Sequence, residues 1–181
     1  MRGVAGRALI LSCLTLFFVC VAATAAQKSY SWEDIDCSRS RIAAWPGLKC
    51  QTTNVVTTEG NVGAFRRWSA SGHTREGYVH LFVWEGQNTY SYVPAEETTG
   101  EFVKWMYGSG SPGQFSAVFR YHNVDAVSFR DGQFPCAGFR RVGSPRRGGY
   151  DWILGGILCA PPGQALTNEQ FGQFIDRVQL R

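Results

Sequence analysis

The feature that most constrains the fold is a turn-rich segment between two apolar segments that each contain one cysteine. The apolar segments are residues 134–142 and 150–159, and Gly, Pro and Ser gather at 144–149. This pattern predicts two antiparallel strands joined by a hairpin turn. In a hairpin centred on the turn, opposed residue numbers sum to about 293, and Cys136 and Cys159 sum to 295. We therefore predict a disulfide across this hairpin.

The N-terminus predicts an export signal. Arg2 and Arg7 precede an apolar stretch, and the small-residue cleavage site Ala23-Thr24-Ala25 follows it, with Thr24-Ala25-Ala26 as an almost equal second choice. We expect residues 1–26 to be a cleaved signal peptide, and residues 27–181 to form a single domain that is periplasmic or secreted, with no membrane span after cleavage. A membrane-anchored protein is the alternative, because an uncleaved segment of about 19 residues is long enough to cross a bilayer.

Cleavage would also remove two of the six cysteines. The other four, an even number in an exported chain, favour disulfides. Those close in sequence bracket short stretches, so we predict the pairs Cys37–Cys50 and Cys136–Cys159. A structural zinc site is the competing interpretation, but no two of these cysteines have the short C-x-x-C spacing that such sites prefer.

Strand patterns dominate the middle of the chain. Beyond the cysteine hairpin, strands are predicted at residues 51–58, 64–70, 78–84, 89–93, 116–122 and 126–130. Asp131-Gly132 is a two-residue hairpin turn signal before residue 134. Because consecutive strands are joined by turns, we expect a mostly antiparallel sheet.

Three short helices are predicted around these strands. One spans residues 38–44, and a second begins with the capping box of Thr98 and Glu101. The third is C-terminal, capped by Thr167 and Gln170, and repeats apolar residues on one side: Phe171, Phe174, Ile175 and Val178. The predicted fold class is thus α+β, a single domain with a mostly antiparallel sheet, a C-terminal amphipathic helix and short flanking helices.

Charge and motifs exclude several functions. Without Arg2 and Arg7 the chain has 16 basic and 14 acidic residues, a net charge of +2 that is too small for a nucleic-acid-binding domain. Residues 108–113 match G-x-G-x-x-G, but a strand follows them where a dinucleotide site needs a helix. The three histidines, His73, His80 and His122, lack metal-ligand spacing, and His80 is expected in the core or on a sheet face. We expect no cofactor and no metal.

The sequence contains no clear catalytic motif. His122 and Asp125 are the polar pair closest to a triad, but no serine lies in a G-x-S-x-G turn. Two acidic groups, at residues 33–36 and Glu96-Glu97, are not predicted to face each other across a cleft. We expect a non-catalytic accessory or binding domain. A small hydrolase of envelope polymers that uses His122 and Asp125 is the alternative.

Four arginines are the candidate anion-binding residues: Arg140, Arg141, Arg146 and Arg147. Guanidinium groups prefer planar anionic partners, so the expected partner is an anionic envelope component, an acidic polysaccharide or an acidic protein. A solvated turn without a partner is the alternative. The chain after residue 26 is also rich in aromatic residues, most of them expected in the core and some available for a sugar-stacking surface.

Overall fold

The computed structural model describes residues 31–57, 63–94, 98–107 and 114–181. Their longer strands are Glu33–Ile35 (β1), Lys49–Thr57 (β2), Gly63–Thr74 (β3), Gly77–Gly86 (β4), Phe119–Tyr121 (β6), Val124–Asp131 (β7), Phe134–Val142 (β8) and Trp152–Cys159 (β11). Three two-residue strands are Val93–Pro94 (β5), Pro145–Arg146 (β9) and Gly149–Tyr150 (β10). The helices are Thr99–Tyr107 (α1) and Asn168–Arg177 (α2), with a 3₁₀ turn at Cys37–Arg39. The predicted signal peptide, the glycine loop at 108–113 and Glu96-Glu97 lie outside the described residues.

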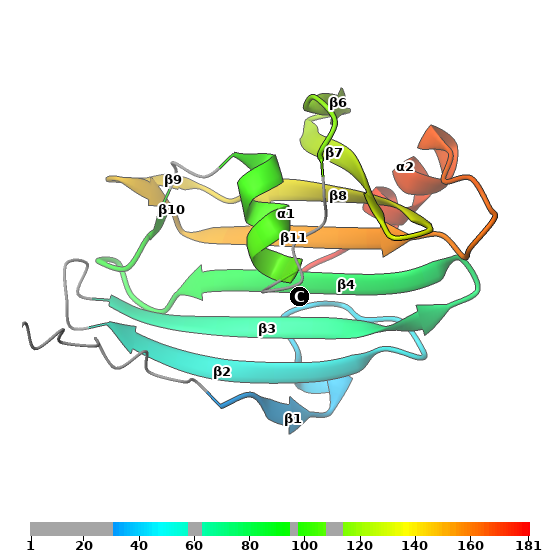
Figure 1. Ribbon diagram of the computed structural model, residues 1–181. Helices are drawn as coiled ribbons and strands as arrows, with labels where there is room; N and C mark the ends of the chain where they lie inside the picture. Colours follow the sequence, from blue (N-terminus) through cyan, green and yellow to red (C-terminus); the bar gives the residue numbers. More distant parts are fainter. Residues whose placement is uncertain (1–30, 58–62, 95–97, 108–113) are drawn as a thin grey trace, which may run out of the picture.

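One antiparallel sheet organises the described residues. Its strand order is β1-β2-β3-β4-β11-β8-β7-β6, and β5, β10 and β9 form a small second sheet at one end (Figure 1). Sequence neighbours pair throughout, except where β11 inserts between β4 and β8. The prediction of a mostly antiparallel sheet with helices in one body is confirmed.

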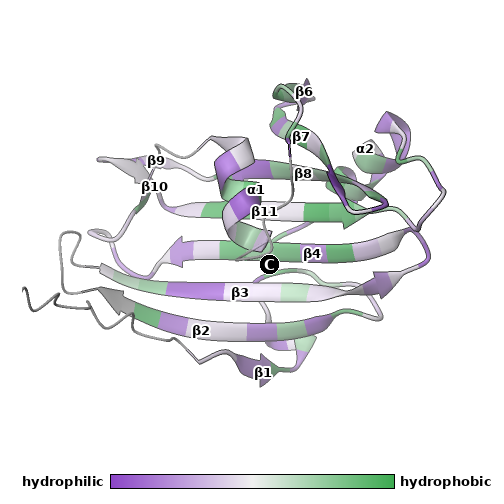
Figure 2. Cartoon of the chain, viewed as in Figure 1, coloured by the Kyte–Doolittle hydropathy of each residue, from purple (hydrophilic) through white to green (hydrophobic). Residues whose placement is uncertain are grey.

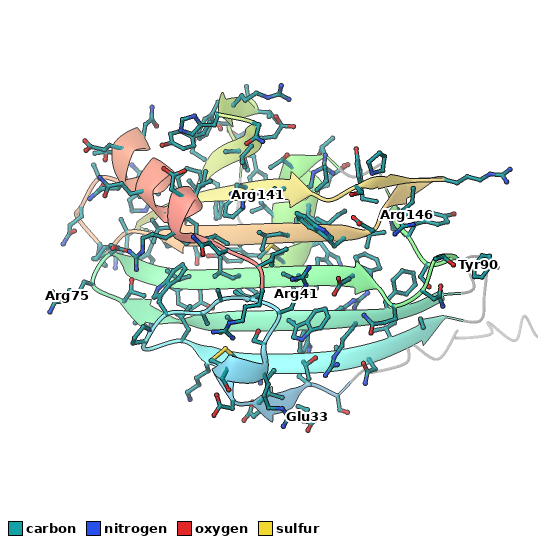
Figure 3. The ribbon with its side chains drawn as sticks, turned by 180° about the vertical axis from the view of Figure 1, so that it is seen from behind. Glu33, Arg41, Arg75, Tyr90, Arg141 and Arg146 are labelled. Carbon is teal, nitrogen blue, oxygen red and sulfur yellow. A yellow bond between two sulfur atoms is a disulfide. The ribbon has the colours of Figure 1, made fainter. Side chains whose placement is uncertain are left out.

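The two described α-helices pack on opposite faces of the sheet. On one face α1 contacts β7, β8 and β11, and its side chains Phe102, Val103 and Met106 are buried there. On the other face α2 buries Phe171, Phe174 and Ile175 (Figures 1 and 3). The hydropathy colouring in Figure 2 accordingly shows the central strand β11 without a hydrophilic stretch and its neighbour β4 as hydrophobic along much of its length. Neither helix is long and apolar enough to cross a bilayer.

Both predicted capping boxes are present. The Glu101 backbone N–H donates to Thr98 Oγ1 over 3.2 Å, and the Thr98 N–H donates to Glu101 Oε2 over 3.0 Å. Thr167 and Gln170 make the same reciprocal pair at the start of α2. These bonds satisfy backbone donors that a helix cannot satisfy internally, which explains why both helices begin at these residues.

Both predicted disulfides are confirmed. Cys37 bonds to Cys50 with a Cα–Cα distance of 5.2 Å, and Cys136 bonds to Cys159 with 4.0 Å. Every β8–β11 pair sums to 295, because the hairpin loop is Arg147–Gly148, one residue later than its predicted centre. Disulfides of this kind form in oxidising compartments and are compatible with an extracellular or periplasmic protein.

Three local predictions are wrong. The helix at 38–44 is only a single 3₁₀ turn, because Ile42 leaves it to pair with Leu180 near the chain end. Residues 89–93 do not return along β4, whose two edges are already occupied by β3 and β11. The loop between β7 and β8 is Gly132–Gln133 instead of Asp131-Gly132, since Asp131 pairs with Phe134.

Candidate functional site

The α1 face of the sheet carries two adjoining hollows. α1 packs on the β7–β8–β11 part of this face, and within the described part of the chain its backbone does not extend over β2 and β3 (Figure 1). One hollow has a volume of about 470 Å³ and the other about 490 Å³. Both are lined by Tyr78, His80 and Met106, so they adjoin each other at these three side chains, and we call the pair of hollows the α1 trough. We call the hollow of about 470 Å³ the Trp105 end and the hollow of about 490 Å³ the Asp131 end.

The Trp105 end combines aromatic rings with hydrogen-bonding groups. Trp105, 41% exposed, lies edge-on to Phe82 with ring centroids 4.8 Å apart and stacks on Trp84 at 6.0 Å. The Arg67 guanidinium lies over both tryptophans, 4.6 Å from the Trp84 ring and 5.3 Å from the Trp105 ring. The polar lining of this end comes from the neighbouring strands β2 and β3: Gln51, Arg67, Ser69 and Ser71.

His80 lies in the middle of the trough. Its Nε2 and the Ser69 hydroxyl oxygen are 3.2 Å apart, within hydrogen-bonding distance. Burial lowers the pKa of His80 to about 4, because the imidazolium would lose its hydration between β3 and β11. At neutral pH the trough therefore has an uncharged imidazole at its centre.

The Asp131 end holds a carboxylate in an apolar hollow. The Tyr107 hydroxyl donates to Asp131 Oδ2 over 2.6 Å. Burial, followed by this bond to Asp131, raises the pKa of Tyr107, so its hydroxyl stays a donor. Ring and aliphatic side chains supply much of the remaining wall, among them Phe134 and Ile157.

Two hairpin ends, the last turn of α1 and the end of β11 build the Asp131 end. Asp131 and Phe134 are an opposed pair at the end of the β7–β8 hairpin. Tyr78 is opposed to His73 at the end of the β3–β4 hairpin, with ring centroids 5.4 Å apart. Met106 and Tyr107 come from the last turn of α1. A ligand there would contact side chains fixed by the sheet and by a packed helix, which limits the ordering cost of binding.

A larger hollow of about 960 Å³ lies between residues 114–117, β7, β8 and the start of α2. Two of its polar side chains already serve the fold. Ser116 Oγ accepts from the Ser128 backbone N–H, and Thr167 belongs to the α2 capping box. Other polar side chains line this hollow too, namely Gln114, Ser128, Arg130 and Asn168. We take the α1 trough as the stronger candidate site because it holds a buried histidine within hydrogen-bonding distance of Ser69 and a carboxylate that accepts from Tyr107.

The structure separates the four candidate arginines. Arg141 donates to the carbonyls of Ile175 and Val178 at the end of α2, where helix carbonyls need partners. Arg140 points to the opposite face and buries its NH1 without a hydrogen-bond partner among the described residues. Arg146 and Arg147 are exposed at the hairpin end, and Figure 3 shows Arg146 far from Arg141. Only this second pair lies on one accessible surface.

The other predicted polar groups have separate positions. His122 is exposed in the β6–β7 turn with a φ of 52°, whereas Asp125 accepts from Arg120 NH2 over 3.0 Å. The described residues show no hydrogen bond between His122 and Asp125. Asp34 accepts from Gln51, and Asp36 caps the 3₁₀ turn. No group of three His, Cys, Asp or Glu residues in the described part of the chain is placed to hold a metal ion.

Sequence reasoning did not find the trough. The alternation of β3 places Arg67, Ser69 and Ser71 on one face, and that of β4 places Tyr78, His80 and Phe82 on one face. The missing information was which of these faces α1 leaves uncovered. Comparisons of the chain with protein-family models, with curated proteins and with solved structures found no match, so the interpretation of the trough depends on its own geometry.

Proposed function

We propose that this protein is an exported, non-catalytic binding domain that holds a small ligand in the α1 trough. The observation that carries the proposal is the pair of adjoining hollows on one face of the sheet, which have Tyr78, His80 and Met106 as a common wall. A concave site with apolar walls and a few convergent polar groups is the usual form of a ligand site. Here the aromatic rings supply contact area, and the polar groups of His80, Ser69 and Asp131 would fix the orientation of a bound ligand.

The chemistry of the trough favours binding over catalysis. Ser69 and His80 are the nearest equivalent of a nucleophile and its base. Burial lowers the pKa of His80 to about 4, which makes it a weak base at neutral pH. Both residues also lie inside strands that are paired on both sides, so their backbone N–H groups belong to the sheet ladder. An oxyanion hole built from those amides is therefore not available to Ser69.

A fragment screen by amide chemical shifts tests the proposal. The panel contains one compound for each ligand class: choline, benzoate, cellobiose and indole. We expect at least one compound to give saturable shifts at Ser69, Ser71 and His80, while Arg146 and Arg147 stay unchanged. Shifts confined to the hairpin end, or no saturable shift with any compound, would contradict the proposal.

A blocked variant makes the screen specific. Ser71 lines the Trp105 end, so Ser71→Trp should fill that hollow and weaken any ligand that spans the trough. Asn54→Trp is the matched control, because Asn54 is exposed on the opposite face of the neighbouring strand. Equal binding by both variants would remove the Trp105 end from the site.

Export through a cleaved signal is part of the proposal. The two disulfides in the described part support it, since such bonds persist in oxidising compartments. We propose that the mature protein starts at Ala26 or Gln27. N-terminal sequencing of the exported protein tests this, and recovery of Arg2 or Arg7 would indicate the anchored alternative.

We propose Arg146 and Arg147 as a second contact, for an anionic partner such as an acidic polysaccharide. Their exposure at the end of a hairpin held by β9, β10 and β5 supports this assignment. A preorganised turn loses little entropy on docking, and two adjacent guanidinium groups attract anions from solution.

A further inference from the structure

We propose that the Asp131 end of the α1 trough binds an organic cation, namely a quaternary ammonium or alkylammonium group. The positive charge would lie against the Asp131 carboxylate, and the methyl or methylene groups would lie against the surrounding rings. The inference rests on the proposed function, because it names the chemistry of the ligand in the same trough.

The acidic side chain in this hollow favours a cationic ligand. Asp131 receives a hydrogen bond from the neutral Tyr107 hydroxyl, and none of the ion pairs formed by the described residues involves Asp131. His80, which lines the same hollow, is uncharged at neutral pH. Asp131 is the one acidic side chain among the described residues that line this hollow, and His73 lines it beside Tyr78. A cationic ligand would therefore find a carboxylate there that has no ion-pair partner among the described residues. An anionic group would be repelled by the same carboxylate.

The aromatic rings around Asp131 also favour an organic cation. Tyr78, Tyr107 and Phe134 line the hollow beside Asp131. Phe134 is 38% exposed although its side chain is apolar, which places this ring at the solvent rim. A cation near the face of an aromatic ring is attracted by the ring quadrupole, and quaternary ammonium groups are recognised by such rings. Met106 adds a polarisable sulfur to the wall.

The residues that line the Asp131 end favour an organic cation over a metal ion. A bare metal ion needs several oxygen, nitrogen or sulfur ligands, and the described residues offer no cluster of three His, Cys, Asp or Glu side chains. One carboxylate among rings instead suits a diffuse charge surrounded by carbon. A saccharide, which needs many hydrogen-bonding partners, fits the Trp105 end better than the Asp131 end, and it is a competing outcome of the test.

Choline and its uncharged carbon isostere 3,3-dimethylbutanol form the test pair. They have nearly the same shape and differ in the positive charge. Isothermal titration and amide shifts of the exported protein should show choline binding at least tenfold more tightly, with shifts at Tyr78, Met106 and Asp131. Equal affinity for the two compounds would overturn the inference.

Variants locate the charge that is responsible. Asp131→Asn keeps the shape and can still accept from Tyr107, and it should weaken choline at least tenfold while changing 3,3-dimethylbutanol less than twofold. Phe134→Leu removes the ring and should weaken choline about threefold or more. Asp125→Asn is the matched control, since it removes an acidic side chain that is paired with Arg120 instead, and choline affinity should stay within twofold. An unchanged affinity in Asp131→Asn would contradict the assignment.

The fragment panel keeps the two proposals distinguishable. If cellobiose or benzoate shifts the trough amides and choline does not, the trough is a ligand site and the cation inference is wrong. If none of the compounds shifts the trough amides, both proposals fail.

Discussion

Gly138 provides a sharp test of how α1 is seated on the sheet. Gly138 lies on β8 below Val103 of α1, and a Cβ atom added there would lie 2.6 Å from Val103 Cγ2 and 2.8 Å from Val103 Cγ1. Ordinary contacts begin at 3.4 Å, so the two groups would have to separate by about 0.8 Å (3.4 minus 2.6). Val103 is β-branched, and its side chain has one preferred rotamer in a helix. The helix itself must therefore move.

The expected cost of Gly138→Ala is about 1–3 kcal/mol of unfolding free energy, the usual range for overpacking a core. Urea denaturation followed by tryptophan fluorescence measures it. Because Trp105, Met106 and Tyr107 lie on the same helix, the change should also alter the trough and the native fluorescence of Trp105. Gly100→Ala is the control on α1, because among the described residues its Cβ would meet Phe115 alone, at an ordinary contact distance of 3.9 Å. That variant should be neutral or more stable by up to about 1 kcal/mol.

A double-mutant cycle isolates the contact. Val103→Ala removes both γ-methyl groups, so the added methyl group in Gly138→Ala would find space. The double variant should be less destabilised than the sum of the single variants by about 1 kcal/mol or more. Additive losses, or a Gly138→Ala protein as stable as the wild type, would refute the packing argument and with it the rigid placement of α1 beside the trough.

Three further predictions concern stability and charge. Replacing Cys136 and Cys159 by Ala should lower the unfolding free energy by about 3.4 kcal/mol, and the same change at Cys37 and Cys50 should lower it by about 3 kcal/mol. Both values follow from the loop lengths that the two bridges close. Stability equal to that of the wild type in non-reducing urea titrations would contradict this. Because His80 has a folded pKa of about 4, below the unfolded value of 6.5, the unfolded chain binds the proton first. Stability should therefore fall as pH drops from about 6.5 to 4, and a His80→Asn variant that kept the same slope would contradict the assignment. Arg146→Ala with Arg147→Ala should slow association with anionic vesicles in a salt-dependent manner without loss of stability, whereas Arg141→Ala should lower the melting temperature because α2 loses two carbonyl partners.

The sequence was most informative where local chemistry decides the structure. The capping residues Thr98 and Thr167 and the symmetric positions of Cys136 and Cys159 act through neighbours or through one hairpin, so the helix starts and the disulfides could be predicted. The failed elements depend on distant partners. Residues 38–44 have a helical pattern, but Ile42 pairs with Leu180 near the other end of the chain. Residues 89–93 have a strand pattern, but β11 already occupies the edge of β4.

The candidate site could not be predicted from the sequence for the same reason, because it depends on partners that are distant in the chain. Four arginines within eight residues indicated one charged surface. Because side chains alternate along a strand, Arg140 and Arg141 lie on opposite faces of the sheet, and Arg141 donates to carbonyls at the end of α2. Asp131, Tyr107 and Tyr78 are far apart in the chain and meet through the packing of α1 between two hairpin ends. Such a meeting depends on strand order and helix placement, which single-sequence patterns do not contain.

The most direct test of the account is an intermolecular nuclear Overhauser measurement between tetramethylammonium and the isotope-labelled exported protein. All methyl protons of this cation are equivalent, so each contact reports its position without ambiguity about orientation. The account predicts contacts from the methyl protons to the rings of Tyr78 and Phe134 and to the Met106 methyl group, and their loss in Asp131→Asn. Contacts confined to other aromatic residues such as Tyr90, which is 84% exposed, or contacts that persist in Asp131→Asn, would contradict it.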